Sequence, residues 1–595
     1  MHDYIIRGGT IFDGSGAAGQ AGDVAVKDGV IVAAGGSINE PARETIDADG
    51  AIVTPAWVDI HTHYDGQVTW DSEMNPSASH GVGTIVMGNC GVGFAPVPPG
   101  GERHLIELME GVEDIPGTAL YEGMPWGAWE TYPQYLDYLA GRSYALDVSS
   151  MIAHGPVRNY VMGPERANAL ATAEEVERMA SLVEEALRAG AVGFSTSRIM
   201  GHRSIHGDQV PGTFAEEAEL AAIAGGMRRA GAGVLQAIPS GTLGTGGGME
   251  HSSLESEVEL ICRMSRLSGR PATFTLFETM EDPSLWPKAI ALVKAGNKAG
   301  ARVRPQVGSR PTGLVFSLGS YHPFMAKPSY LSLKALPLAE RAKAMRDPAT
   351  KAAIMSEASV APQYPGKMES LIVVAPLPMQ QTYPLTSAST YEPTADESFE
   401  AMAKAAGGAD GAGWSAIYDH LVKGDGTDFA ITFFTGYANY SLDAHRAMQL
   451  DESTVVGLSD GGAHVGLIFD AVSPTYQLTY WARDRKRGDT IPLAHVINRQ
   501  TRRNAELFGF TDRGLIAPGM RADLNVIDFA NLSLGELALK ADLPAGGSRL
   551  LQPASGYLAT MVAGELTRRH DDDTGARPGR LLRSRAEAAA TALAS

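Results

Sequence analysis

Two histidines separated by one residue, His61 and His63, end an apolar run in the segment "WVDIHTH". If this run forms a β-strand, both imidazoles project to the same side of it, because side chains two residues apart share a face. Imidazole nitrogens are frequent ligands of zinc. A pair with this spacing also occurs in ordinary strands and at surfaces, so a metal site needs further ligands from other segments.

Two other segments offer such ligands. Cys90 lies in "GNCG", directly after the apolar run "GTIVM", and a thiolate beside imidazoles suits Zn²⁺. Asp460 lies in "LSDGGAH", where a carboxylate would contact the metal and accept a proton from a water molecule. A simpler explanation of Cys90 is a small buried thiol, and a simpler explanation of Asp460 is an ordinary turn residue. The predicted metal site therefore requires that the three segments meet in space.

The fold predicted from the pattern of strands and helices would bring these segments together. From about residue 57 onward, eight apolar runs alternate with helical segments, which is typical of a TIM-like (β/α)8 barrel of the α/β class. The predicted strands are 57–63, 83–90, 146–155, 191–197, 232–238, 272–277, 301–307 and 454–460. In a closed barrel the first, second and eighth strands are neighbours, and barrel enzymes hold their sites at the carboxyl ends of the strands.

Both ends of the chain have a different character. Short strands with tight turns fill residues 3–53, and strand patterns return after about residue 510. We expect a small β-sandwich domain built from both chain termini. The predicted divisions are 1–56, a barrel at 57–505 with insertions near 97–140 and 360–450, and 506–595 including a helical or frayed tail.

The composition is that of a globular protein. Of the 595 residues, 44% are hydrophobic, which is enough for a large core and an accessory domain. The formal charge of −19 disfavours an electrostatic grip on nucleic acid or anionic lipid, so we expect neither nucleic acid nor a membrane as partner. With two cysteines and no signal-peptide pattern, the expected location is the cytoplasm. Association into a homo-oligomer stays open.

Several segments together resemble the amidohydrolase superfamily, and specifically its N-acyl-D-amino-acid deacylase (D-aminoacylase) branch. The matching stretches, in order, are "TPAWVDIHTHYDGQ", "MGNCGVGFAPV", "MEGVEDIP", "IAHGPVRNYVMG", "VPGTFAEEAEL", "LSDGGAH", "TRRNAELFGFTDRGLIAPGMRADLNVID" and "TGARPGRLLR". The resemblance implies a TIM-like barrel with a β-sandwich from both termini. It also implies metal-assisted hydrolysis of a non-peptide amide C–N bond in a small-molecule substrate, with one or two Zn²⁺ ions. By position, it makes His61 and His63 paired ligands, Cys90 a ligating or bridging thiolate, and Asp460 the catalytic base and a metal contact.

The chain departs from this branch on the fifth and sixth strands, which usually supply further histidines. Here those stretches read "LQAIPSG" and "TFTLFET". Gln236 or Ala237 faces the fifth-strand position, and the register places Leu276 at the sixth-strand histidine. Glu278 falls on a lysine position that relatives direct toward the substrate carboxylate. A Glu there would repel that carboxylate unless an arginine, such as Arg310, binds it.

Further candidates for contact with substrate lie around the expected barrel mouth. They are His154 on the third strand, His202 and His206 in the loop "RIMGHRSIHGDQ", Gln236, Glu278 and Arg310, with Arg198, Arg203 and His464 as weaker ones. Each also has a plain structural explanation. His154 is equally explained as a hydrogen-bonded histidine of the core. The two loop histidines are explained as surface residues, and the arginines as members of structural ion pairs.

Three interpretations of the metal site stay open. A single metal is held by the two histidines, Cys90 and Asp460; or Glu278 or Gln236 completes a rearranged site; or the chain binds metal weakly or not at all. The corresponding functions are a deacylase-like amidohydrolase, a hydrolase of a cyclic or neutral amide or small peptide, and a catalytically silent barrel scaffold. In the hydrolases, the metal would acidify a water, and Asp460 would take its proton and pass it to the leaving nitrogen.

Overall fold

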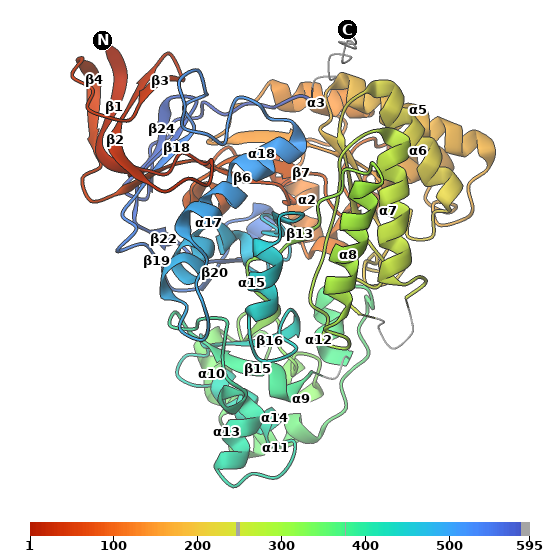
Figure 1. The fold of residues 1–595 in the computed structure, drawn as a ribbon. Helices are drawn as coiled ribbons and strands as arrows, with labels where there is room; N and C mark the ends of the chain where they lie inside the picture. Colours follow the sequence, from red (N-terminus) through yellow and green to blue (C-terminus); the bar gives the residue numbers. More distant parts are fainter. Residues whose placement is uncertain (245–249, 375–376, 585–595) are drawn as a thin grey trace.

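Three regions of the molecule are visible in the computed structural model (Figure 1), which describes residues 1–244, 250–374 and 377–584. A β-rich unit contains the amino terminus, parallel strands and helices form the centre, and a smaller lobe lies at the opposite end from the β-rich unit. The predicted site residues follow the strands of the centre.

The central strands are short and buried. They are β6 (Trp57–Asp59), β7 (Val82–Met87), β8 (Asp147–Ser150), β9 (Ile152–Ala153), β10 (Gly193–Ser197), β11 (Val234–Ile238), β12 (Ala272–Phe274), β13 (Gln306–Val307) and β17 (Val455–Val456). They pair in parallel in the orders β6-β7-β8, β9-β10-β11-β12 and β13-β17. Each of the eight runs expected from the sequence contains at least one of these strands. All of their residues are buried, as expected of parallel strands that are covered on both faces.

Single bridges connect the edges of these sheets. A parallel bridge between Thr275 and Gln306 links the end of β12 to β13. Another between Thr62 and Gly461 links the segments that follow β6 and β17. The segments after the first and last strands therefore lie side by side, although about 400 residues of chain separate them.

Helices around the strands begin and end at the capping residues that the sequence shows. Helix α5 (Ala173–Ala189) starts with a capping box formed by Thr172 and Glu175 and ends at Gly190, whose φ is 115°. Ser253 caps α7 (Leu254–Ser268), which also ends at a left-handed glycine. The other helices of the centre are α4 (His154–Met162), α6 (Glu217–Ala230), α8 (Leu285–Lys298), α15 (Asp443–Leu450), α17 (Leu493–Gln500) and α18 (Arg502–Phe508).

Strands from both ends of the chain form one nine-stranded sheet. They are β1 (His2–Ile11), β2 (Gln20–Lys27), β3 (Val30–Ala34), β4 (Ala42–Asp47), β5 (Ile52–Pro55), β18 (Leu524–Ile527), β23 (Tyr557–Val562), β24 (Glu565–Arg569) and β25 (Asp572–Asp573). The two ends meet where β5 pairs antiparallel with β18. The expected helical or frayed tail falls on residues 585–595, which lie outside the described residues.

Two further segments supply the walls of the site. The first contains α1 (Glu102–Glu113), α2 (Gly117–Gly123) and α3 (Tyr132–Ala140). The second is the lower lobe in Figure 1, where β14 (Thr312–Ser317), β16 (Phe429–Thr435) and β15 (Thr382–Leu385) form an antiparallel sheet in that order. Its helices are α9 (Pro328–Leu331), α10 (Leu338–Met345), α11 (Pro348–Ser356), α12 (Met368–Val374), α13 (Phe399–Ala405) and α14 (Gly413–Leu421). This lobe begins near Thr312, about 50 residues before the expected insertion, because β14 finds its partner, β16, more than 100 residues later.

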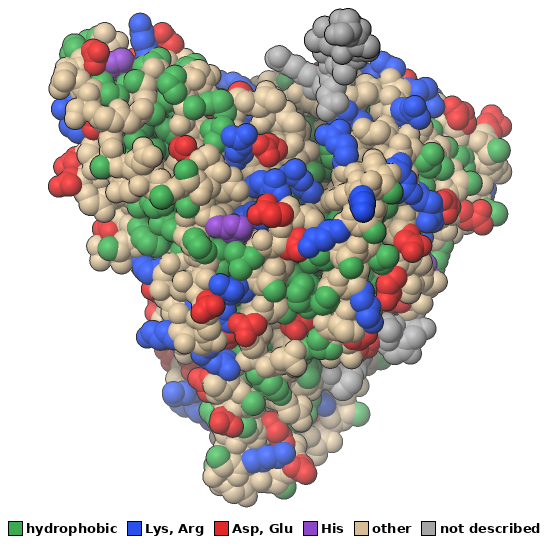
Figure 2. Space-filling model, viewed as in Figure 1, with side chains coloured by type: hydrophobic (Ala, Val, Ile, Leu, Met, Phe, Trp, Pro, Cys, Tyr) green, Lys and Arg blue, Asp and Glu red, His purple; other side chains and the backbone are tan. Residues whose placement is uncertain are grey.

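The surface carries charges of both signs. On the face shown in Figure 2, acidic and basic side chains are interspersed. Among the described residues, every helix is too short or too polar to cross a membrane.

Candidate metal centre

Three of the predicted ligands converge beyond the carboxyl ends of β6 and β7. His61, His63 and Cys90 each offer one ligand atom, and these atoms lie within 4.8 Å of one another. Cys90 Sγ lies 3.3 Å from His61 Nε2 and 3.7 Å from His63 Nε2. All three side chains are buried. The segments after the first and second strands therefore share one site.

Asp460 joins this group from the segment after β17. Its Oδ1 lies 3.4 Å from His61 Nε2 and 3.9 Å from His63 Nε2. Its backbone amide donates to the carbonyl of His61 at 3.1 Å, which fixes the segment beside the first strand. The side chain is 20% exposed, so the carboxylate lies where the buried centre meets open space.

Three of these side chains, His61, His63 and Cys90, lie close enough to share one tetrahedral ion, and Asp460 lies beside both imidazoles. With metal–ligand bonds of about 2.0–2.3 Å, the ligand atoms of tetrahedral zinc are about 3.3–3.8 Å apart. The four measured separations range from 3.3 to 3.9 Å. Two imidazole nitrogens, a sulfur and a carboxylate oxygen are also donors that zinc accepts. The residues present therefore fit a zinc ion.

Burial leaves this group short of positive charge. It lowers the pKa of His61 to about 4 and that of His63 well below its usual range, so both rings are neutral near pH 7. Burial, with neighbouring acidic side chains adding to it, raises the pKa values of Cys90, Glu113 and Asp460 well above their usual ranges. A cluster of buried acids around neutral imidazoles is stabilised by a divalent cation.

Gln306 orients His61 from the seventh strand. Its Oε1 accepts a hydrogen bond from His61 Nδ1 at 2.8 Å, which leaves the lone pair of Nε2 directed toward Cys90 and Asp460. Such outer partners fix the tautomer and the ring orientation of ligating histidines. The sequence analysis missed Gln306. The available signal was a polar residue at the end of the run "ARVRPQV".

Glu113 lies on the other side of the pair, at the end of α1. Its Oε1 is 3.4 Å from His63 Nδ1 and its Oε2 is 3.5 Å from His464 Nε2. The carboxyl group is buried, and the sequence analysis did not single it out. Its position in the stretch "MEGVEDIP" could have suggested it, since that stretch is one of those that carry the family resemblance.

Three residues of the centre have left-handed backbone conformations. The φ angles are 57° at Cys90, 50° at Asp460 and 50° at His464. This region is unfavourable for residues other than glycine, and such strain concentrates at functional sites. The turns after the second and eighth strands therefore keep a strained backbone conformation that directs these side chains toward the centre.

A cavity of about 360 Å³ opens onto the four ligands. His202 and His464 lie in its wall together with mainly apolar side chains. His202 Nδ1 is 2.9 Å from Ser197 Oγ, and burial lowers the pKa of His202 to about 3. Of the predicted substrate-contacting residues, His202 is the one that reaches this cavity, and the weaker candidate His464 does so too.

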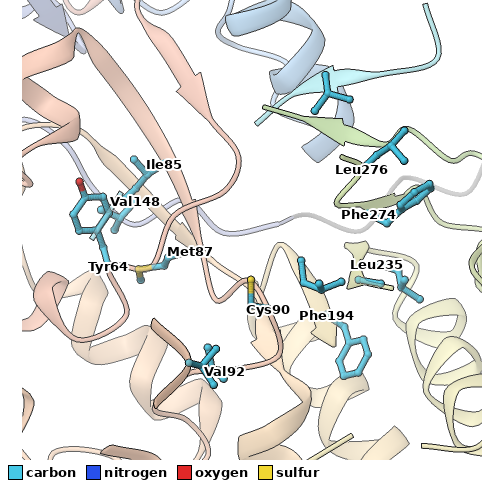
Figure 3. Packing of buried hydrophobic residues seen from close by; sticks show 14 of the residues in the cluster. Tyr64, Ile85, Met87, Cys90, Val92, Val148, Phe194, Leu235, Phe274 and Leu276 are labelled. Atoms are coloured by element: carbon cyan, nitrogen blue, oxygen red, sulfur yellow. The ribbon is translucent and has the colours of Figure 1, made fainter. Parts of the chain in front are cut away.

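The fifth and sixth strands present neutral groups where relatives were expected to have histidines. Gln236 faces the centre, and its Oε1 accepts the backbone N–H of Cys90 at 3.2 Å. On the sixth strand Thr275 lines the cavity, whereas Leu276 packs in the hydrophobic core (Figure 3). The expected register of Leu276 is wrong by one residue, because Thr275 and Phe277 line the cavity and Leu276 between them points to the opposite side.

Two of the predicted histidines serve elsewhere. His154 is fully buried outside the cavity, with Nε2 2.8 Å from Glu219 Oε1 and Nδ1 2.9 Å from Thr196 Oγ1. Both of its ring nitrogens are thus engaged, as in a hydrogen-bonded core histidine. His206 is exposed, 3.3 Å from Glu107 Oε2. The structure gives neither a position for substrate contact.

Arg310 and Glu278 are also held away from the cavity. Arg310 Nε donates to Asp470 Oδ1 at 2.7 Å, and its guanidinium carbon lies 4.0 Å from the centroid of the Tyr391 ring. Glu278 Oε2 accepts the backbone N–H of Ala438 at 3.3 Å. Neither lines the cavity, so neither the expected anion contact by Arg310 nor a metal site completed by Glu278 matches these positions.

The chain is similar to several known proteins. A model of the amidohydrolase family matches residues 44–568. D-aminoacylase of Alcaligenes xylosoxydans xylosoxydans is 34% identical over 194 residues, which are 33% of this chain and 37% of that protein. The chain thus spans about two fifths of the length of the first curated relatives that it matches.

Two solved structures resemble the whole chain. A D-aminoacylase studied for its binuclear metal center has a TM-score of 0.63 at 22% identity, with 98% of this chain and 100% of that chain covered. N-acyl-D-glutamate deacylase from Bordetella bronchiseptica, complexed with zinc and a phosphonate inhibitor, has a TM-score of 0.61 at 23% identity, with 98% and 99% covered. At these identities the likeness shows a shared fold. Since the family model matches most of its length, the chain belongs to the amidohydrolase family.

Proposed function

We propose that this chain is a metal-dependent hydrolase of a non-peptide amide C–N bond, related in chemistry to the N-acyl-D-amino-acid deacylases. The observation that carries the proposal is the group of His61, His63 and Cys90, whose ligand atoms lie within 4.8 Å of one another beside a cavity of about 360 Å³. Asp460 Oδ1 lies 3.4 and 3.9 Å from the two imidazoles of this group. The names of the relatives, D-aminoacylase and N-acyl-D-glutamate deacylase, support it.

We also infer that the central strands form one closed TIM-like (β/α)8 barrel spanning about 57–505. The bridge between Thr275 and Gln306 and the bridge between Thr62 and Gly461 support closure, because they join sheets that are otherwise separate. The nine-stranded sheet supports a second domain, a β-sandwich, made from 1–56 and 506–595.

The centre is best suited to one zinc ion. His61, His63, Cys90 and Asp460 would hold it, and the fifth and sixth strands add the neutral side chains of Gln236 and Thr275 instead of further imidazoles. When bound, a divalent ion supplies two effects, acidification of a water molecule and polarisation of the acyl oxygen.

Asp460 is placed to move the proton. Its carboxylate lies at the edge of the cavity, next to both histidines and in reach of a water molecule there. It would take the proton from the attacking water as the new C–O bond forms and deliver it to the nitrogen as the C–N bond breaks. The products are a carboxylic acid and a free amine. His202 and His464 face the same space and would contact the substrate.

A combined metal and activity measurement tests this proposal. We expect about one zinc per chain in the purified protein, loss of amide hydrolysis on chelation, and its return when zinc is added. Asp460→Asn is expected to lower kcat by at least about 100-fold without unfolding the chain. His61→Ala should lose the zinc.

The matched control is His206→Ala, because His206 is exposed and outside the cavity. Its activity should stay within about twofold of wild type. Full activity of Asp460→Asn, or of metal-free protein, would overturn the proposal.

We place the chain in the cytoplasm with a small-molecule amide as its partner. Both cysteines are free and buried, which supports a reducing compartment. Homo-oligomer formation stays a prediction.

A further inference from the structure

The wall of the cavity beyond the ligands is apolar. Side chains from several separate segments contribute to it, among them Ile199, Ile238, Phe277, Leu314, Met368 and Phe434. Both insertions take part, since Val112 comes from α1 and Leu314 from β14. An apolar wall of this kind selects ligands by the burial of apolar surface.

Among the described residues that line this cavity, none is a lysine or an arginine. The arginines that the sequence offered for binding a substrate carboxylate are engaged elsewhere. Arg198 Nε donates to Glu257 at 2.6 Å, Arg203 Nε donates to the carbonyl of Met200 at 2.9 Å, and Arg310 pairs with Asp470. Of the residues that are not described, 245–249 and 375–376 contain no basic residue in the sequence, and 585–595 contain one, Arg585.

The side chains at the centre would leave no net positive charge there after a zinc ion is bound. Cys90 and Asp460 would together offset the two charges of a zinc ion, and the buried carboxyl group of Glu113 lies on the other side of His63. The remaining nitrogen-bearing side chains of the wall are histidines, which are not permanent cations. A substrate carboxylate would therefore give up its hydration without gaining a cationic partner.

We propose that the substrate is an uncharged amide with apolar groups on both sides of the scissile bond, rather than an N-acyl amino acid with a free carboxylate. This inference rests on the proposed amide hydrolysis and specifies its substrate class. An acylated arylalkylamine represents the class, since its ring would pack on the apolar wall and its amide would reach Asp460.

The test compares two substrates that differ only in the carboxylate, N-acetyl-2-phenylethylamine and N-acetyl-D-phenylalanine. With zinc-loaded wild-type protein, release of the amine gives kcat/KM for each. We expect the neutral amide to be favoured by at least about 100-fold. Equal values, or a preference for the acid, would overturn the inference.

Binding separates this inference from the proposed function. In Asp460→Asn loaded with zinc, calorimetry gives the Kd of each compound without turnover. Binding of the neutral amide at least about tenfold tighter than the acid supports the inference even when wild type hydrolyses neither, a result that would overturn the proposed function alone. Equal or tighter binding of the acid, or no binding of the neutral amide, would overturn the inference.

A charge placed in the wall gives an independent check. Leu314 is half-buried on β14, so Leu314→Lys can reach the cavity, and Leu314→Gln is the matched control of similar length and polarity without the charge. The lysine variant should shift the ratio of kcat/KM values toward N-acetyl-D-phenylalanine by at least about tenfold, and the glutamine variant should not. If Leu314→Lys leaves the ratio of kcat/KM values unchanged, the absence of a cation from the wall is not the cause of the preference for the neutral amide.

Discussion

His61 illustrates how a single side chain at this centre depends on its outer partner. Its Nε2 takes part in the four-atom set only while Nδ1 donates to Gln306, 245 residues away in sequence. His63 is flanked by Glu113 in a looser arrangement, at 3.4 Å. At the scale of the residue, the metal site therefore includes groups that hold the rings and touch no metal.

The first prediction concerns Gln306. Gln306→Leu removes the acceptor for His61 Nδ1, so the ring loses its fixed tautomer and orientation, and the Kd for zinc should rise by about 10- to 100-fold. Competition with a chromogenic chelator measures it.

Gln306→Glu keeps an acceptor oxygen at the same place and serves as the control. It should bind zinc at least as tightly as wild type, since a carboxylate makes the imidazole a stronger donor to metal. Unchanged zinc affinity in Gln306→Leu would show that His61 is oriented by other contacts.

At the scale of the element, the turns that follow the strands carry the site, and the helices keep the strands in place. The residues of β7, β10 and β11 are all buried. Cys90 and Asp460 follow their strands in left-handed conformations, which a regular strand or helix does not provide. Helices α5 and α7, in contrast, begin at the side-chain caps Thr172 and Ser253 and end at left-handed glycines.

The second prediction concerns the first turn of α5. Thr172 accepts the backbone N–H of Glu175 and the side chain of Glu175 accepts the backbone N–H of Thr172, so Thr172→Ala leaves the backbone N–H of Glu175 without its acceptor. The variant should be less stable by about 1 kcal/mol, measured as a lower urea midpoint.

Thr172→Ser is the control for this substitution, because it keeps the capping hydroxyl. Its midpoint should match wild type within error, and zinc binding should be unchanged in both variants since α5 lies outside the metal centre. If the serine and alanine variants lose the same amount of stability, the methyl group of Thr172 stabilises the helix and the capping hydroxyl does not.

At the scale of the whole molecule, buried polar contacts join the centre to the carboxyl-terminal region. His80 Nε2 donates to the carbonyl of Gln552 at 3.1 Å, and Nδ1 lies 2.8 Å from Thr475 Oγ1. Trp57 Nε1 donates to Tyr557 Oη at 3.3 Å in the same region. These contacts connect residues about 400 to 500 positions apart, so they depend on both parts of the chain being folded.

The third prediction is a pH dependence that arises from His80. Burial lowers the pKa of His80 to about 3, against 6.5 when the ring is in water. Between these values the unfolded chain takes up a proton that the folded chain does not, so stability falls as the pH decreases from 7 toward 4. For one group the slope is at most about 1.4 kcal/mol per pH unit.

His80→Gln provides the comparison because glutamine does not titrate. The variant should have a lower Tm than wild type at pH 7, and the difference in Tm should narrow as the pH is lowered to 5. Thermal unfolding at pH 7, 6 and 5 measures both. A difference that stays constant or widens would show that His80 does not remain neutral in the folded chain.

The sequence by itself determined the local structure and indicated which residues would bind a metal. The apolar runs gave all eight strand positions, Thr172 and Gly190 bounded α5, and the motif of His61 and His63 indicated a metal site with Cys90 and Asp460. These features depend on residues a few positions apart, whose backbone preferences and side-chain spacing are visible in the sequence itself.

The tertiary structure alone decided which side chains serve that site. Thr275 instead of Leu276 faces the cavity, Gln306 and Glu113 support the ligands, and Arg310 is withdrawn into an ion pair. Each of these outcomes depends on packing between segments far apart in the chain. A side chain's direction and partners are set by the neighbours that folding brings to it, and sequence spacing carries little information about those neighbours.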